Sequence, residues 1–178
     1  RDDFIRNSEL DAHTAGAVYT ERYGALQSRL DNAKAFKEAL SVDGDPSKGY
    51  DPNRYLMLLE YPEGRDPRAA IAVGNPDTAK HVSVTVPGMD THATSLPSMA
   101  NEAAALRDTA EYQLKLAGQG DEKVAAIAWF GYDPPDTTDG SVVEVLGERR
   151  ANEAAPDLAD FYRGINATNE HGSDVHLS

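Results

Sequence analysis

The sequence predicts an α/β fold in which a helical arm precedes a β-hairpin and then parallel strands joined by crossover helices. Three observations predict it. The first forty residues have helical spacing of apolar side chains, two closely spaced strand-like segments follow from residue 54, and strand and helix patterns alternate from residue 81. Such alternation favours parallel strands linked by right-handed crossovers. We therefore expect a helical arm and linker over residues 1–45 and an α/β domain over residues 46–178.

The predicted arm helix has one apolar face. The apolar side chains of this face recur at three- and four-residue steps. They are Tyr23, Leu26, Leu30, Ala33 and Leu40. The segment from Ser41 to Pro46 is rich in turn formers and ends the helix. Two interpretations stay open: the helix packs on the domain that follows, or it belongs mainly to a region upstream.

Three strands are predicted next. Residues 54–60 and 69–74 are separated by a turn rich in Pro, Gly and Asp, so we expect them to form a hairpin. Residues 81–86 are rich in β-branched side chains, and Pro87 and Gly88 end this third strand.

The rest of the chain predicts two helices and two strands. Apolar residues recur with helical period from Leu96 to Leu114. The continuous apolar run 124–130 is typical of a strand covered on both faces. A helix over residues 154–165 and a strand over residues 175–177 follow. The inward-facing side chains of that helix are expected to be Leu158, Phe161, Tyr162 and Ile165.

Composition excludes several classes of partner. Lys and Arg number 17 and Asp and Glu number 30, which gives a net charge of −13 in 178 residues. Nucleic acids and anionic membranes require clustered basic residues, so neither is expected as a partner. No apolar run approaches the roughly 20 residues of a membrane-spanning helix. The chain has no cysteine, which excludes thiol catalysis but leaves the compartment open, either cytoplasmic or exported.

Metal and cofactor sites are not expected. The five histidines lack the spacing of metal ligands. Asp133, Asp136 and Asp139 lack the glutamate that completes a calcium loop. Gly64, Gly74 and Gly88 stand in separate turns, so no phosphate-binding loop is present.

Two turns at strand ends are the candidate functional segments. The first, Thr85 to Thr91, contains Gly88, and the amides after this glycine could act as anion donors beyond the carboxyl end of a strand. The second follows Trp129 and Phe130, which we expect in the core, and places Tyr132 and Asp133 where they could line a pocket. Each turn has a purely structural alternative, since Gly ends strands and Asp before Pro forms turns.

These motifs together resemble an actinobacterial family of α/β-hydrolases whose physiological function is unassigned. The resemblance rests on residues 72–79, on Val82 to Thr91 with its Val-Pro-Gly-x-x-Thr core, and on residues 128–135 with the form Trp-x-Gly-Tyr-Asp-x-Pro. The motifs occur in the order of the family and cover roughly residues 54–178. The resemblance implies that the domain is the N-terminal part of an α/β-hydrolase sheet.

The resemblance also implies roles for individual residues. The backbone N–H of Met89, in the turn with Gly88, would donate to an oxyanion, and such a donor is worth about 2.7–4 kcal/mol of barrier. Asp90, Thr91, Tyr132 and Asp133 would be pocket residues. The family usually has a small residue at the position of Met89 and Gly at that of Asp90, which affects the detailed geometry of this turn.

The resemblance places the catalytic groups outside these 178 residues. The family's nucleophile is a serine in a Gly-x-Ser-x-Gly turn after the strand that begins near Val175, and no such motif occurs here. His171 and His176 precede that turn, in the wrong order for the catalytic base, and Ser178 falls inside the presumed strand. We therefore expect a domain truncated before the nucleophile elbow. It would be inactive by itself, while its parent would hydrolyse a small-molecule ester or, as a second choice, an amide.

Two alternatives remain. One is a complete non-catalytic α/β interaction module with a helical arm. The other is an incomplete homologue that forms a homo-oligomer through an uncovered sheet edge, for which strands 124–130 and 82–86 are the candidates.

Overall fold

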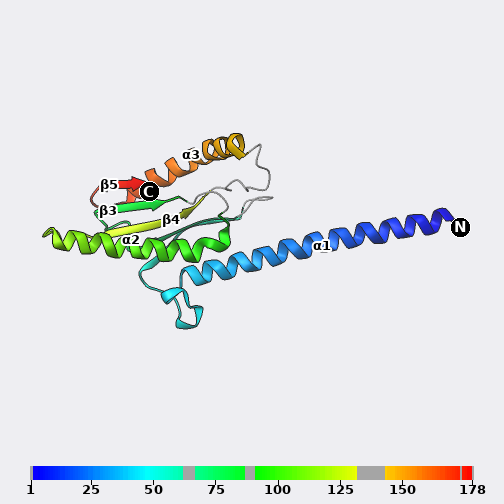
Figure 1. Ribbon diagram of the computed structural model, residues 1–178, viewed down its shortest axis with the longest axis horizontal. Helices are drawn as coiled ribbons and strands as arrows, with labels where there is room; N and C mark the ends of the chain where they lie inside the picture. Colours follow the sequence, from blue (N-terminus) through cyan, green and yellow to red (C-terminus); the bar gives the residue numbers. More distant parts are fainter. Residues whose placement is uncertain (1, 62–66, 87–90, 132–142, 173, 178) are drawn as a thin grey trace. The chain divides into compact units, whose positions relative to one another are not determined.

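The computed structural model describes residues 2–61, 67–86, 91–131, 143–172 and 174–177, and the side chains of residues 2–18, 21, 143–154 and 174–177 are not described. The chain divides into two compact units, Arg1–Lys34 and Ala35–Ser178, and each is described by itself. Figure 1 shows the helices and strands. In chain order they are α1 (Asp2–Ala39), β1 (Arg54–Glu60), β2 (Arg68–Val73), β3 (His81–Thr85), α2 (Leu96–Leu116), β4 (Val124–Phe130), α3 (Val143–Thr168) and β5 (Asp174–Leu177). Three short 3-10 turns occupy Val42–Gly44, Pro46–Lys48 and Ala93–Ser95.

The helical arm is confirmed as the helix α1. Tyr23, Leu26 and Leu30 are exposed. The buried side chains of α1 that belong to the second unit are those of Ala35, Phe36 and Ala39. Phe36 and Ala39 join the core of the sheet, and the second compact unit begins at Ala35.

The sheet has five strands in the order β1-β2-β4-β3-β5. The predicted hairpin is confirmed, since β1 and β2 pair antiparallel with a register shift between Leu56 and Leu58. The predicted parallel strands are confirmed as well, because β3 pairs parallel with both β4 and β5. β2 also pairs antiparallel with β4, which joins the hairpin to the parallel strands in one mixed sheet.

The two strands proposed as an uncovered edge are interior strands. β4 lies between β2 and β3, and β3 lies between β4 and β5. Their backbone groups are used in pairing on both sides, so the edge assigned to them does not exist. Among the described strands, the edges of the sheet are β1 and β5.

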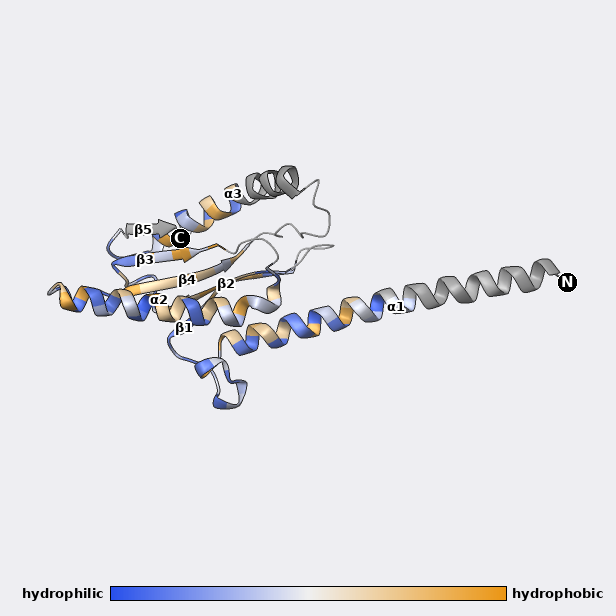
Figure 2. Ribbon diagram, in the orientation of Figure 1, coloured by the Kyte–Doolittle hydropathy of each residue, from blue (hydrophilic) through white to orange (hydrophobic). Residues whose placement is uncertain are grey.

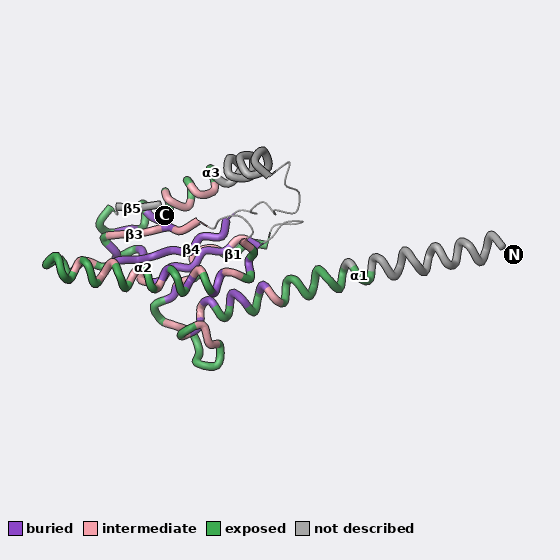
Figure 3. The backbone as a smooth tube through the Cα atoms, viewed as in Figure 1, coloured by how far each residue is buried: buried purple, intermediate pink, exposed green. Residues whose placement is uncertain are grey.

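Helices cover both faces of the sheet. On one face α2 contributes Leu96, Ala100 and Ala103 to a core with alternate residues of β2 and β4. On the other face Phe161 and Ile165 of α3 pack against the remaining alternate residues of these strands and against β3. Every residue of β4 is therefore buried, as its uninterrupted apolar sequence predicts. Figure 2 shows the apolar colour of this strand, and Figure 3 shows its burial between the two helices.

One helix is longer than the sequence predicts. α3 begins at Val143, whereas the predicted helix begins at residue 154. The prediction treated the stretch up to Arg150 as irregular, although its Glu, Leu and Arg residues are strong helix formers. The helix also continues through an internal proline, Pro156. The inward face over Leu158, Phe161, Tyr162 and Ile165 is confirmed.

Candidate functional site

The carboxyl ends of three parallel strands meet at one edge of the sheet. Thr85 of β3 lies opposite Ala128 of β4, and Val84 of β3 lies opposite Leu177 of β5. The loops that leave β3 and β4 and the position that follows β5 therefore share this edge. In open α/β sheets this is where ligands bind. We call it the carboxyl edge.

The structure describes only some of the predicted site residues. Gly88, Met89, Asp90, Tyr132 and Asp133 lie outside the described residues. Thr91 is described and is half-buried, just before the 3-10 turn that leads into α2. Trp129 and Phe130 are buried, as the sequence predicts, on opposite faces of the sheet.

Gly131 is required where the chain leaves β4. It is buried, and a Cβ built at this position would overlap the Cζ2, Cε2 and Cη2 atoms of the Trp129 indole. The indole is almost completely buried and is packed against the ring of Phe161, with 6.5 Å between ring centroids. Because the ring has little room to move, only glycine fits between β4 and the candidate segment that follows.

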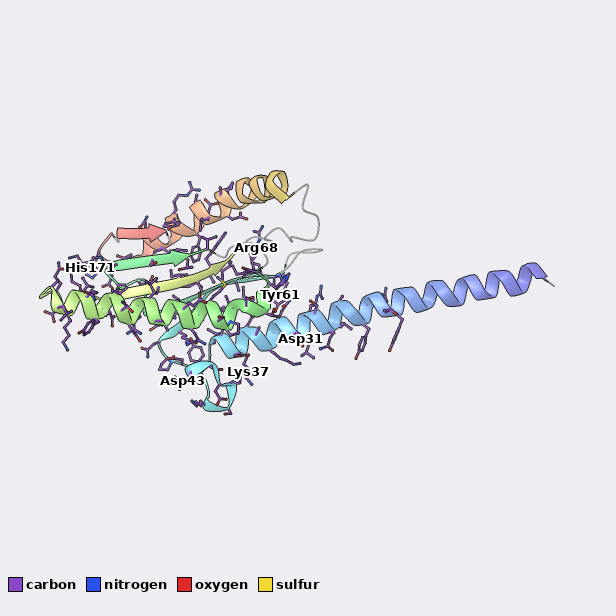
Figure 4. All side chains as sticks on the ribbon, in the orientation of Figure 1. Asp31, Lys37, Asp43, Tyr61, Arg68 and His171 are labelled. Atoms are coloured by element: carbon purple, nitrogen blue, oxygen red, sulfur yellow. The ribbon has the colours of Figure 1, made fainter. Side chains whose placement is uncertain are left out.

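A small cavity lies beside the end of β4, on the face that α3 covers. Its volume is about 240 Å³, and Leu58, Trp129, Gly131 and Phe161 form its apolar wall. Arg68 of β2 lies at its polar side, where its Nη1 atom is 2.7 Å from the Oδ2 atom of Asp157 on α3. Figure 4 labels Arg68 near the start of β2. Sequence reasoning missed this pair, because two charged residues so far apart in the chain carry no common motif.

The motif block 72–79 lies away from the carboxyl edge and has a structural role. Gly74 has a φ of +86°, and a Cβ there would lie 2.6 Å from the carbonyl oxygen of Val124. The Nδ2 group of Asn169, after α3, donates to the carbonyl oxygens of Pro76 and Ala79 at 2.7 Å each. Thr168 Oγ1 donates to Asp77 Oδ1 at 2.7 Å. These contacts hold the end of α3 against the start of β3.

A charged cluster also lies at the start of β3, at the opposite edge. Glu122 accepts from Lys80 Nζ at 2.5 Å, and its Oε2 atom is 2.7 Å from His81 Nε2. The hydrogen bonds from Lys80 and then from His81 lower the pKa of Glu122 below its ordinary value. Since this cluster is at the amino ends of β3 and β4, it is not part of the carboxyl edge.

Two features are absent from the described residues. In the described part of the chain, no group of three or more His, Cys, Asp or Glu side chains could hold a metal ion. Within the same residues, no helix combines the length and the apolar character needed to cross a membrane.

Comparison with known proteins gives a family and several relatives. A family model described as alpha/beta hydrolase matches residues 63–178. Uncharacterized proteins of Mycobacterium bovis and Mycobacterium tuberculosis are each 36% identical over 132 residues, which cover 71% of this chain and 47% of the relative. Another uncharacterized protein of Mycobacterium tuberculosis is 38% identical over 104 residues, or 55% of this chain and 14% of the relative. The chain thus spans about half the length of the first two relatives. No solved structure matches the chain significantly.

Proposed function

The chain belongs to the alpha/beta hydrolase family, and on that premise we propose that the protein containing it is a serine hydrolase of small-molecule esters, with amides as a second choice. The observation that carries the proposal is the carboxyl edge. The parallel register of β3 with β4 and β5 sets the carboxyl end of β3 beside that of β5, which supports the proposal. In the α/β-hydrolase fold the oxyanion donor and the nucleophile must lie close together, at this edge of the sheet.

We assign the nucleophile to a serine in the turn that follows β5. In the α/β-hydrolase fold the nucleophile stands on a sharp turn between a strand and a helix. None of the 178 residues forms a Gly-x-Ser-x-Gly motif, and the chain spans about half the length of two relatives. The proposal therefore places the serine, the acid and the histidine of the triad after Ser178, and residues 1–178 are inactive by themselves.

We assign one oxyanion donor to the loop between β3 and α2. In this fold an N–H group of that loop and the N–H group after the nucleophile together hold the oxyanion. In the present chain the backbone N–H of Met89, in the Gly88 turn, is the proposed donor. Asp90, Thr91, Tyr132 and Asp133 are the proposed pocket residues, since they come from the two loops at the same edge.

The proposed reaction is acyl transfer through the serine. The serine Oγ bonds to the ester carbonyl carbon as its proton passes to the histidine, and the two N–H groups stabilise the oxyanion. The bond from the carbonyl carbon to the leaving oxygen then breaks, and the alcohol departs with the proton held by the histidine. Water then attacks the acyl carbon as its proton passes to the histidine. The bond from that carbon to the serine Oγ breaks, and the histidine returns the proton to Oγ, which releases the acid and the free serine.

The test compares residues 1–178 with the full natural protein. We expect the full protein to hydrolyse a chromogenic short-chain ester and to lose this activity on treatment with a fluorophosphonate. Residues 1–178 should hydrolyse no ester. Their rate of ester hydrolysis should equal that of the same chain after heat denaturation, which is the control. A coding sequence that stops directly after Ser178 would overturn the proposal and favour a non-catalytic interaction module.

A further inference from the structure

The cavity beside the end of β4 lies at the carboxyl edge of the sheet. Because β2 runs antiparallel to β4 and Ala69 pairs with Phe130, Arg68 at the start of β2 is level with the end of β4. Glu60, the last residue of β1, pairs with Arg68. The described sheet residues that line the cavity thus come from the strand ends that border this edge. We call it the β4 cavity.

The wall of the β4 cavity is formed by one aliphatic and two aromatic side chains. Leu58 and Trp129 lie on the same face of the sheet, since Ala70 of β2 pairs with both of them. The indole extends into the place that a side chain at Gly131 would take. Phe161 of α3 packs against the indole, with 6.5 Å between ring centroids. A wall of this kind favours an apolar ligand group, and an aromatic ring above all.

The charged residues of the β4 cavity are already paired with one another. The Nη1 atom of Arg68 is 2.7 Å from Oδ2 of Asp157 and 3.9 Å from Oε2 of Glu60. Asp160 forms an ion pair with Arg163. Each acidic residue among the described lining residues therefore has an arginine partner. A ligand group of either charge would have to compete with these pairs, so the cavity favours an uncharged group.

The volume of the β4 cavity suits one group of a ligand. It is about 240 Å³, whereas a cavity of roughly 150 Å³ with apolar walls holds a benzene molecule. Pockets that enclose a whole drug-sized ligand measure roughly 300–1,000 Å³. The β4 cavity therefore has room for an aryl group and part of the chain that carries it, while the rest of the ligand lies outside.

The β4 cavity is within reach of the proposed serine. β4 neighbours β3, and β3 neighbours β5. Adjacent strands lie about 4.8 Å apart, so the end of β4 is about 10 Å from the end of β5. On the basis of the serine hydrolase function given above, we propose that the β4 cavity binds an uncharged aryl group of the ester substrate. A short chain joins this group to the ester at the serine after β5.

Kinetics of the full natural protein test the preference for an aryl group. Methyl ω-phenylhexanoate carries the ring in its acid half and ω-phenylhexyl acetate in its alcohol half, while methyl hexanoate and hexyl acetate are the matched esters without it. We expect kcat/KM to be at least about tenfold higher for one aryl ester than for its matched ester, which identifies the half that the cavity binds. Equal values within both pairs would overturn the proposal and leave the hydrolase function standing. A protein that hydrolyses none of the four esters would contradict the hydrolase function and this proposal with it.

Substitution of Leu58 tests whether the preference arises in the β4 cavity. Leu58→Phe fills the cavity and should lower the ratio of the two kcat/KM values by about tenfold, whereas Leu58→Ala enlarges it and should raise kcat/KM for a naphthyl ester relative to the phenyl ester. Leu59→Phe is the matched control and should leave the ratio unchanged, because Leu59 is exposed and pairs with Ala69, which belongs to the core on the other face. A variant that only loosens the fold lowers the rates for all esters alike, so the ratio separates the two effects. An equal fall in the ratio for Leu58→Phe and Leu59→Phe would overturn the proposal.

Discussion

The indole of Trp129 fills the space that a side chain at Gly131 would need. This relationship fixes the chain at the end of β4, where the second candidate loop begins. The ring itself is held between the sheet and Phe161 of α3. The glycine in the Trp-x-Gly-Tyr-Asp motif is thus explained by packing, since the tryptophan two residues earlier excludes every larger residue.

Replacement of Gly131 by alanine is expected to destabilise the protein by about 1–3 kcal/mol, the usual cost of overpacking a core. Chemical denaturation measures it. Gly164→Ala is the control, because a Cβ at Gly164 in α3 meets open space. Alanine in a helix interior should there be neutral or stabilising by about 0.5–1 kcal/mol. The cost of Gly131→Ala should shrink in a Trp129→Phe background, and an unchanged cost would contradict the packing explanation.

Asn169→Ala should cost about 1–3 kcal/mol of unfolding free energy, because it removes the donor from two carbonyl oxygens, those of Pro76 and Ala79. Asn169 is buried, and its Oδ1 atom also accepts from the backbone N–H of His171 at 2.8 Å. Asn53→Ala at an exposed position is the matched control. Equal denaturation midpoints for the two variants would show that Asn169 does not hold α3 in place.

Arg54→Met is expected to lower the free energy of unfolding by about 1.5–3 kcal/mol or more, since this is the usual contribution of a hydrogen bond to a charged group. The buried Arg54 guanidinium donates to the Ala39 carbonyl oxygen at 2.6 Å and to Asn101 Oδ1 at 2.7 Å. It therefore ties the end of α1 and the second turn of α2 to the start of β1. Arg163→Met removes an exposed arginine paired with Asp160 and should cost at most about 1 kcal/mol. Thermal unfolding compares the two variants. A larger loss of stability for Arg163→Met than for Arg54→Met would contradict the role given to Arg54.

The hydrogen bonds of Glu122 with Lys80 and His81 should make the stability of the protein depend on pH in the acid range. The pKa of Glu122 is lowered from an ordinary value of 4.5, first by the hydrogen bond from Lys80 and then by that from His81. A carboxyl whose pKa is lower in the folded state stabilises the protein above its unfolded-state pKa. That contribution is lost as the pH falls through the folded-state value. The parent should therefore have a higher denaturation midpoint than Glu122→Gln near neutral pH, and the difference should shrink as the pH falls below 4.5 and through the lower folded-state pKa of Glu122. A difference that persists unchanged in acid would contradict the ion-pair assignment.

Much of the fold follows from local patterns. The uninterrupted apolar run of β4 predicts a strand covered on both faces, and the helical period after Leu96 predicts α2. The order of the strands is not local information, so the interior positions of β3 and β4 escaped the sequence analysis. The early start of α3 was missed because Gly147 and Pro156 weaken its helical pattern.

The candidate site is less predictable than the fold. The alternation of strands and helices after residue 81 is sufficient to bring the loops after β3 and β4 to one edge, because parallel neighbours end together. The Arg68–Asp157 pair and the overlap of Trp129 with Gly131 depend on side-chain contacts that form only when the sheet and α3 pack. Neither has a sequence signature.

The most direct test of the account is the position of a fluorophosphonate adduct on the full natural protein, found by peptide mapping. We predict one modified serine in the turn directly after β5, with no adduct on residues 1–178, and loss of labelling when that serine is replaced by alanine. An adduct on a serine within residues 1–178, or on a serine remote from the end of β5, would contradict the assignment of the active site to the carboxyl edge.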